Sequence, residues 1–178
     1  MTEIAVVGAV DPARAIAEDR IRHLLRSGEA TRAGRAGEFT GRPTTHLVGN
    51  DELVLKKRSE LRYRPGDDER WIVRTLDRER ALGLHHPAKT WLLLTGQDGR
   101  TIANVTPRLA PLDKTMPDST PEQCVPALEH LLALYTDAFV RHERQLDPGL
   151  SNFGTDAGGN LYYIDDESAP ARGLASLA

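Results

Sequence analysis

Two aspartates and an asparagine in the last third of the chain have the types and spacing that phosphoryl transfer requires. Four residues separate Asp147 from Asn152, and Asp165 follows the apolar run Leu-Tyr-Tyr-Ile. One carboxylate can orient the hydroxyl that attacks a phosphate, while an amide oxygen and a second carboxylate are hard ligands that suit Mg²⁺. The pattern therefore indicates Asp147 as a catalytic base and Asn152 and Asp165 as metal ligands.

Each of these residues also has an ordinary interpretation. Asp147 precedes Pro148-Gly149, where an aspartate commonly stabilises a turn, and Asn152 could stabilise the same turn. Asp165 could be one of two acidic residues at an exposed strand end, next to Asp166. Adjacent carboxylates repel each other unless a cation or solvent offsets their charge, which favours a metal at this position.

The periodicity of apolar residues predicts the elements that must position this loop. In chain order they are a helix over 12–26, a hairpin of 44–49 with 52–60, a helix within 64–84, a hairpin over 90–109, a proline-rich linker over 110–121, a helix over 121–142 and a hairpin of 151–155 with 160–165. The helix over 121–142 has an apolar stripe of Leu128, Leu131, Leu132, Tyr135 and Phe139. Antiparallel hairpins interleaved with helices predict an α+β fold.

Composition narrows the functional classes. The chain has 178 residues, of which 39% are hydrophobic and 28% charged, with a formal net charge of −3. This charge argues against nucleic-acid binding by broad electrostatic attraction. The chain has a single cysteine, Cys124, which excludes a disulfide framework, and we expect this residue to pack in the core. No further histidine or cysteine lies at the spacing from His85-His86 that a zinc site needs. No apolar run reaches membrane-spanning length and no basic region precedes the first apolar run, so we expect a cytoplasmic protein without a membrane partner.

The order of these features resembles the protein-kinase-like superfamily, and is nearest to its aminoglycoside and small-molecule phosphotransferase branch. The resemblance rests on Asp147-x₄-Asn152, on Asp165 after a hairpin, and on the elements before them, and it extends from about Thr44 to Glu167. It implies a kinase-like two-lobe architecture with an antiparallel N-lobe sheet and a much reduced helical C-lobe. The corresponding domains are an N-terminal helix and loop extension (1–43), an N-lobe-like part (44–112) and an abbreviated C-lobe-like part with the catalytic-type loop (113–178).

The resemblance also implies a nucleotide site, with ATP and Mg²⁺ as cofactors. Lys56 would grip the phosphates, with Lys57 facing the other way, and Glu79 of the following helix would pair with Lys56. A solvated lysine at a strand end and a surface glutamate, with Asp77 as a competitor, are the alternatives. The hinge that holds adenine would comprise Arg108, Leu109 and Ala110.

Two functions follow from this resemblance. The first is an ATP- and Mg²⁺-dependent phosphotransferase acting on an unidentified hydroxyl acceptor. The second is a non-catalytic, pseudokinase-like binding or regulatory module that works through a protein partner. Gln145, at a position where the family usually has histidine, and the thirteen residues after Asp165 favour the second. A reduced C-lobe would leave apolar surface, so we expect a protein partner or self-association to cover it.

Overall fold

The computed structural model describes residues 2–32, 45–61, 63–64, 66–97 and 99–171, and it confirms the α+β class. The chain forms two compact units. The first comprises Met1–Arg80 and His85–Arg108, and the second comprises Ala81–Leu84 and Leu109–Ala178. None of the helices in the described ranges is both long and apolar enough to cross a membrane.

A six-stranded antiparallel sheet forms the centre of the first unit, in the order β1-β5-β6-β4-β3-β2. Its strands are β1 (Glu3–Ala9), β2 (Glu29–Arg32), β3 (Thr45–Gly49), β4 (Leu53–Arg58), β5 (Thr90–Gly96) and β6 (Gly99–Pro107). The predicted hairpins β3–β4 and β5–β6 are present. Strands β1 and β2 lie within the segment that was expected to be a helix and loop extension, and they form the two edges of the sheet.

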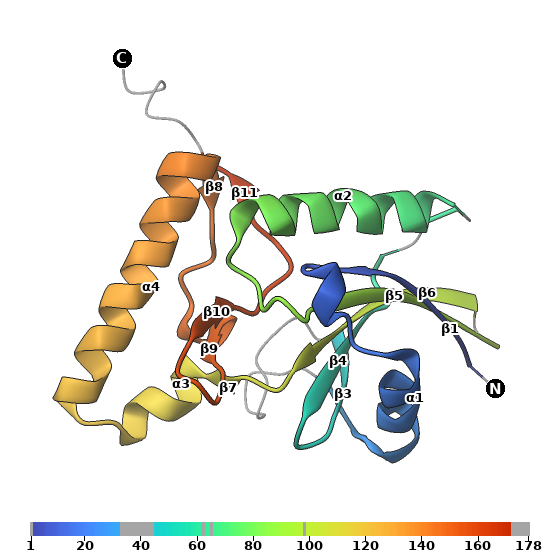
Figure 1. The fold of residues 1–178 in the computed structure, drawn as a ribbon, viewed down its shortest axis with the longest axis horizontal. Helices are drawn as coiled ribbons and strands as arrows, with labels where there is room; N and C mark the ends of the chain where they lie inside the picture. Colours follow the sequence, from blue (N-terminus) through green and yellow to red (C-terminus); the bar gives the residue numbers. More distant parts are fainter. Residues whose placement is uncertain (1, 33–44, 62, 65, 98, 172–178) are drawn as a thin grey trace. The chain divides into compact units, whose positions relative to one another are not determined.

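Helices α1 (Glu18–Ser27) and α2 (Asp67–Leu82) cover opposite faces of this sheet (Figure 1). Ile21 and Leu24 of α1 pack on one face, and Ile72 and Leu76 of α2 pack on the other. The predicted helix over 12–26 begins only at Glu18. The segment before it forms the short 3₁₀ helix η1 (Pro12–Arg14), because the carboxylate of Asp11 accepts a hydrogen bond from the Ala13 N–H and caps that turn instead.

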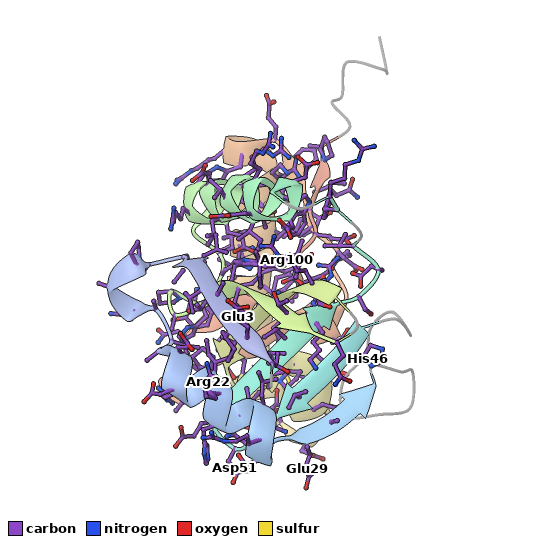
Figure 2. All side chains as sticks on the ribbon, turned by 90° about the vertical axis from the view of Figure 1, so that its right-hand side faces the viewer. Glu3, Arg22, Glu29, His46, Asp51 and Arg100 are labelled. Atoms are coloured by element: carbon purple, nitrogen blue, oxygen red, sulfur yellow. The ribbon has the colours of Figure 1, made fainter. Side chains whose placement is uncertain are left out.

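Polar contacts fasten α2 to the sheet at both ends. Near its start, Asp68 is buried and lies 3.3 Å from Arg100 Nε at the beginning of β6, and Figure 2 shows Arg100 between the sheet and this helix. Toward its end, Arg80 Nη2 donates to the Ala9 carbonyl at 2.7 Å. These contacts fix the orientation of α2 and therefore the positions of the side chains that it directs at the sheet.

The second unit is built around α4 (Pro121–His142), whose bounds match the predicted helix. Thr120 and Gln123 form a capping box at its start. The other elements are β7 (Ala110–Pro111), α3 (Leu112–Thr115), η2 (Met116–Asp118), β8 (Arg144–Gln145), η3 (Leu150–Asn152), β9 (Phe153–Thr155), β10 (Leu161–Tyr163) and β11 (Ala169–Pro170). The segment 110–121, expected to be a linker, thus folds into β7, α3 and η2 because Leu112 is buried in the core of this unit.

Candidate functional site

The predicted hairpin β9–β10 places Asn152 beside the segment that carries Asp165. Phe153 pairs with Tyr163 in the antiparallel register, and one step further the Ile164 N–H donates to the Asn152 carbonyl at 2.7 Å. Asp165 follows Ile164 directly, so the two predicted metal ligands lie at the same end of one hairpin. Phe153 and Tyr163 are buried in the core of the second unit, which anchors this end of the hairpin.

A turn centred on Gly149 brings Asp147 close to Asn152, at the end of the β9–β10 hairpin. The Gly149 N–H donates to Asp147 Oδ1 at 3.0 Å, and the Asn152 N–H donates to the Gly149 carbonyl at 2.9 Å. A Cβ atom at Gly149 would lie 3.3 Å from both Asp147 Oδ1 and Asn152 Nδ2. The side chains of Asp147 and Asn152 therefore both lie close to Gly149, where a larger residue would make them shift by a few tenths of an ångström.

Asp147 has the turn-stabilising role that was its ordinary interpretation. In this turn Asp147 uses only its Oδ1 atom. Its other carboxylate oxygen, Oδ2, has no hydrogen-bond partner among the residues that the structure describes. The residue is exposed. The turn therefore fixes the direction of the carboxylate and leaves one oxygen able to accept a proton.

The hydroxyl of Tyr163 ties the loop together. It accepts a hydrogen bond from the Asp147 N–H at 3.2 Å and donates to the Glu167 carbonyl at 2.9 Å. Burial raises the pKa of Tyr163, and the charges of Asp165, Asp147 and Asp166 raise it further, against the opposing effect of the Asp147 N–H. Burial therefore dominates the environment of this hydroxyl, and the charges of Asp165, Asp147 and Asp166 act on it in the same direction.

The raised pKa of Tyr163 predicts a pH effect with a definite sign. Because the pKa is higher in the folded than in the unfolded chain, the neutral hydroxyl stabilises the fold fully below the unfolded value of about 10, and the contribution is lost as pH rises through the folded pKa. In a titration of phenolate absorbance, we expect wild type to show one late-ionising tyrosine that is missing in Tyr163→Phe. Identical profiles above pH 10 would contradict this assignment.

Asp165, the second predicted metal ligand, has a backbone contact to its carboxylate. The Asp166 N–H donates to Asp165 Oδ1 at 2.8 Å, and the Asp166 side chain is buried. Within the described ranges, no group of three or more His, Cys, Asp or Glu side chains could hold a metal. Mg²⁺ needs no such group, because it is commonly held by one or two carboxylates together with substrate phosphates. The carboxamide of Asn152 and the carboxylate of Asp165 are ligands of the oxygen type that Mg²⁺ prefers.

In the first unit, Lys56 lies on the sheet face that α2 covers. It pairs with Asn104 of β6, and Asn104 pairs in turn with Trp91 of β5, whose ring packs against α2. Directly paired residues point to the same face of a sheet. Lys57 therefore points to the opposite face, as the sequence predicted.

Glu79, which was expected to pair with Lys56, pairs with Lys89 instead. Its Oε1 lies 2.7 Å from Lys89 Nζ and 3.9 Å from His85 Nε2, and its Oε2 accepts a hydrogen bond from Trp91 Nε1 at 2.8 Å. Glu79 and Lys89 are about 99% and 98% buried. The reason is topological: Lys89 leads into β5, directly beneath α2, whereas β6 lies between Lys56 and β5.

Lys89 was missed because its sequence context carries no signal for burial. A lysine directly before a strand is usually solvated, and its Nζ lies here 5.2 Å from the Trp91 ring centroid. The neighbouring histidines also have contacts other than a metal. His85 lies against Glu79, and His86 Nδ1 accepts a hydrogen bond from the Ala88 N–H at 3.1 Å.

The three predicted hinge residues span the junction between the two units. Arg108 belongs to the first unit, where its Nη1 donates to the Asn50 carbonyl at 2.9 Å and its N–H donates to the Glu52 carbonyl at 2.7 Å. Leu109 and Ala110 belong to the second unit, in which Ala110 pairs with Thr155. The side chain of Arg108 thus anchors the β3–β4 turn, a role that the sequence did not suggest.

Comparison with known proteins assigns no family to this arrangement. No family model matches the chain, and neither a curated protein nor a solved structure is found to be similar to it. The candidate site therefore rests on the contacts among its own residues.

Proposed function

We propose that this chain is an ATP- and Mg²⁺-dependent phosphotransferase of kinase-like fold, acting on a hydroxyl acceptor in the cytoplasm. The observation that carries the proposal is that the Gly149 turn holds the side chains of Asp147 and Asn152 close together, beside the end of the β9–β10 hairpin that leads into Asp165. Phosphoryl transfer requires groups of these kinds. They are a carboxylate with one oxygen that accepts no other hydrogen bond, an amide and a second carboxylate.

The proposed roles follow from the contacts of each residue. Asp147 accepts or orients the proton of the attacking hydroxyl through Oδ2, while the bond from Gly149 to Oδ1 holds the carboxylate in place. Asn152 and Asp165 would hold Mg²⁺, which supplies positive charge to offset that of the phosphates. Lys56 would bind the phosphates of ATP, and the segment Arg108–Ala110 would hold its adenine.

Two features of the units support a kinase-like architecture. The first unit is an antiparallel sheet covered by a helix whose buried glutamate, Glu79, is paired with a lysine. The second unit has a long helix, α4, directly before the loop with Asp147. Glu79 pairs with Lys89 and not with Lys56, so the structure supports the glutamate–lysine pair of this architecture at a different lysine from the one that the proposal assigns to the phosphates.

The experiment that tests the catalytic role replaces Asp147 with alanine. We expect ADP release from Mg-ATP, measured across a panel of hydroxyl acceptors and with water alone, to fall by roughly 100-fold or more, because general-base assistance contributes about 10²–10⁴-fold. The matched control is Asp156→Ala, which removes a carboxylate whose hydrogen bonds, in the part of the chain that the structure describes, stay within the same hairpin, to Gly158, Asn160 and Tyr162. Unchanged turnover in Asp147→Ala would remove Asp147 from the reaction.

The second candidate function is a non-catalytic nucleotide- or protein-binding module. Two observations favour it: Asp147 already has a turn role, and the expected pair of Glu79 with Lys56 is replaced by Glu79 with Lys89. The two functions differ in a simple way, since a binding module would bind Mg-ATP or a protein partner and release no ADP with any acceptor.

A further inference from the structure

Helix α2 carries a row of arginines on its solvent side. Arg70, Arg74 and Arg78 follow one another at intervals of four residues, and all three are exposed. Each interval advances the row by about 6 Å along the helix axis and turns it by about 40°, so the guanidinium groups lie along one side of the helix. Among the described residues of the first unit, no other helix or strand lies on the side of α2 that faces away from the sheet (Figure 1).

Little acidic charge neutralises this arginine row. In the described part of the chain, Arg74 and Arg78 have no carboxylate partner, and Arg78 donates to Thr75 Oγ1 at 3.3 Å. Glu69 is turned by about 140° from Arg74 around the helix. The other carboxylates of α2 form ion pairs within the first unit, which join Asp67 to Arg70, Asp68 to Arg100, Asp77 to Arg80 and Glu79 to Lys89.

The same side of α2 bears an exposed aromatic ring. Trp71 precedes Arg74 by three residues and Arg78 by seven, which places it beside them. The Tyr63 ring lies against Trp71, with centroids 6.0 Å apart and planes 32° apart, and Tyr63 is 42% exposed. Trp71 packs edge-on in turn against the buried Trp91, with centroids 5.4 Å apart. Tyr63 is thus held in place by a stack of rings and can receive a second planar group from solvent.

Guanidinium groups beside an exposed ring suit a single-stranded nucleic acid, whose phosphates pair with cations while its bases stack on aromatic side chains. A duplex keeps its bases stacked within itself, and a chain of glutamates has no planar base, so either would leave Tyr63 unused. Like charges at four-residue intervals destabilise a helix, and bound phosphates would offset this repulsion in the arginine row. The chain as a whole has a formal net charge of −3, so the attraction is confined to this side of α2.

We propose that the arginine row of α2, together with Tyr63, binds a single strand of DNA or RNA. The row would contact three successive phosphates, and one base would stack on Tyr63. Arg70 is 75% exposed, so its ion pair with Asp67 is screened by water and can open toward a phosphate. This surface includes no residue of the candidate phosphotransferase site, so nucleic-acid binding and phosphoryl transfer can each be present without the other.

A first test measures how the binding depends on salt. Fluorescence anisotropy follows a labelled oligonucleotide of about fifteen thymidines between about 50 and 200 mM salt. Three phosphate contacts predict that the logarithm of the affinity falls with the logarithm of the salt concentration at a slope of about −2, which is a loss of roughly 20-fold over this range. Absence of binding by about 100 µM wild type at the lowest salt would overturn the proposal.

A double variant identifies the arginines that make these contacts. Arg74→Gln with Arg78→Gln should bind the oligonucleotide at least about tenfold more weakly at the lowest salt and reduce the slope to about −0.7. The matched control is Arg14→Gln with Arg26→Gln, which removes the same charge from exposed arginines of η1 and α1. We expect the control to bind as wild type does. Equal affinities of the two double variants would show that the arginine row is not the binding surface.

The role of the ring is tested at constant charge. Tyr63→Ala is expected to weaken binding roughly tenfold, because it removes the stacked base contact, whereas Tyr63→Phe keeps the ring and should bind as wild type does. Equal affinities of these two variants would contradict base stacking on Tyr63.

Competition distinguishes the other ligands. A peptide of about fifteen glutamates should displace the oligonucleotide only at concentrations at least about tenfold above those of an unlabelled oligonucleotide, because it cannot stack on Tyr63. Displacement at equal concentrations would mean that the arginine row accepts any anionic chain, and displacement by Mg-ATP would place the oligonucleotide at a nucleotide site. Either result would overturn the assignment of this surface to single-stranded nucleic acid.

Discussion

Replacing Asp165 with asparagine is expected to weaken Mg²⁺-dependent ATP binding by roughly 100-fold, measured by displacement of a fluorescent nucleotide. The change removes a negative charge from the proposed metal site and retains the shape of the side chain. The Asp166 N–H donates to Asp165 Oδ1 at 2.8 Å, and an asparagine oxygen can accept the same bond. The local backbone should therefore keep its conformation. Weaker ATP binding would then be due to the loss of the negative charge at position 165.

The matched control for this prediction is Asp156→Asn in the turn of the same hairpin. Hydrogen bonds from Asn160 lower the pKa of Asp156, which shows that its carboxylate is used within the turn. We expect this variant to bind Mg-ATP within about twofold of wild type. If Asp165→Asn bound Mg-ATP as tightly as Asp156→Asn, the metal-ligand role of Asp165 would be wrong.

Replacing Lys89 with methionine is expected to lower the free energy of unfolding by about 3–5 kcal/mol, because it leaves the buried carboxylate of Glu79 without its cation. Lys89 Nζ and Glu79 Oε1 are 2.7 Å apart, and both side chains are almost completely buried. The matched control is Lys114→Met, which breaks a partly exposed ion pair with Asp113 and should cost less than about 1 kcal/mol. Urea unfolding measures both variants.

A double variant separates the buried pair from simple loss of packing. In Glu79→Gln with Lys89→Met, the amide oxygen still accepts the Trp91 Nε1 hydrogen bond, and no charge remains buried without a partner. We expect the double variant to recover at least half of the stability lost in Lys89→Met. Additive losses from the two single changes would show that Glu79 and Lys89 do not stabilise each other.

The sequence predicted the elements with strong periodicity and clear caps. The helix Pro121–His142 has its expected bounds, because a threonine cap and a first-turn proline precede a long apolar repeat. The β9–β10 hairpin was predicted from the glycine-rich turn between two short apolar runs, and it is present. These are local signals, so a single sequence is enough to find them.

Features that depend on tertiary packing could not be predicted in this way. Leu131 and Leu132 belong to the same apolar stripe in the sequence, yet only Leu131 is buried, because periodicity locates an apolar face without identifying the element that covers it. The partner of Glu79 likewise depends on which strand lies beneath α2. Strand β1 was missed because its burial does not alternate regularly and its pairing with β5 is shifted between Val6 and Gly8.

The most direct test of the proposed function is a calorimetric titration of ATP into the wild-type chain, once with Mg²⁺ and once with a chelator in its place. If the loop of Asp147, Asn152 and Asp165 is a nucleotide–metal site, ATP should bind with Mg²⁺ and at least about tenfold more weakly without it. Absence of ATP binding in both titrations would contradict the phosphotransferase proposal.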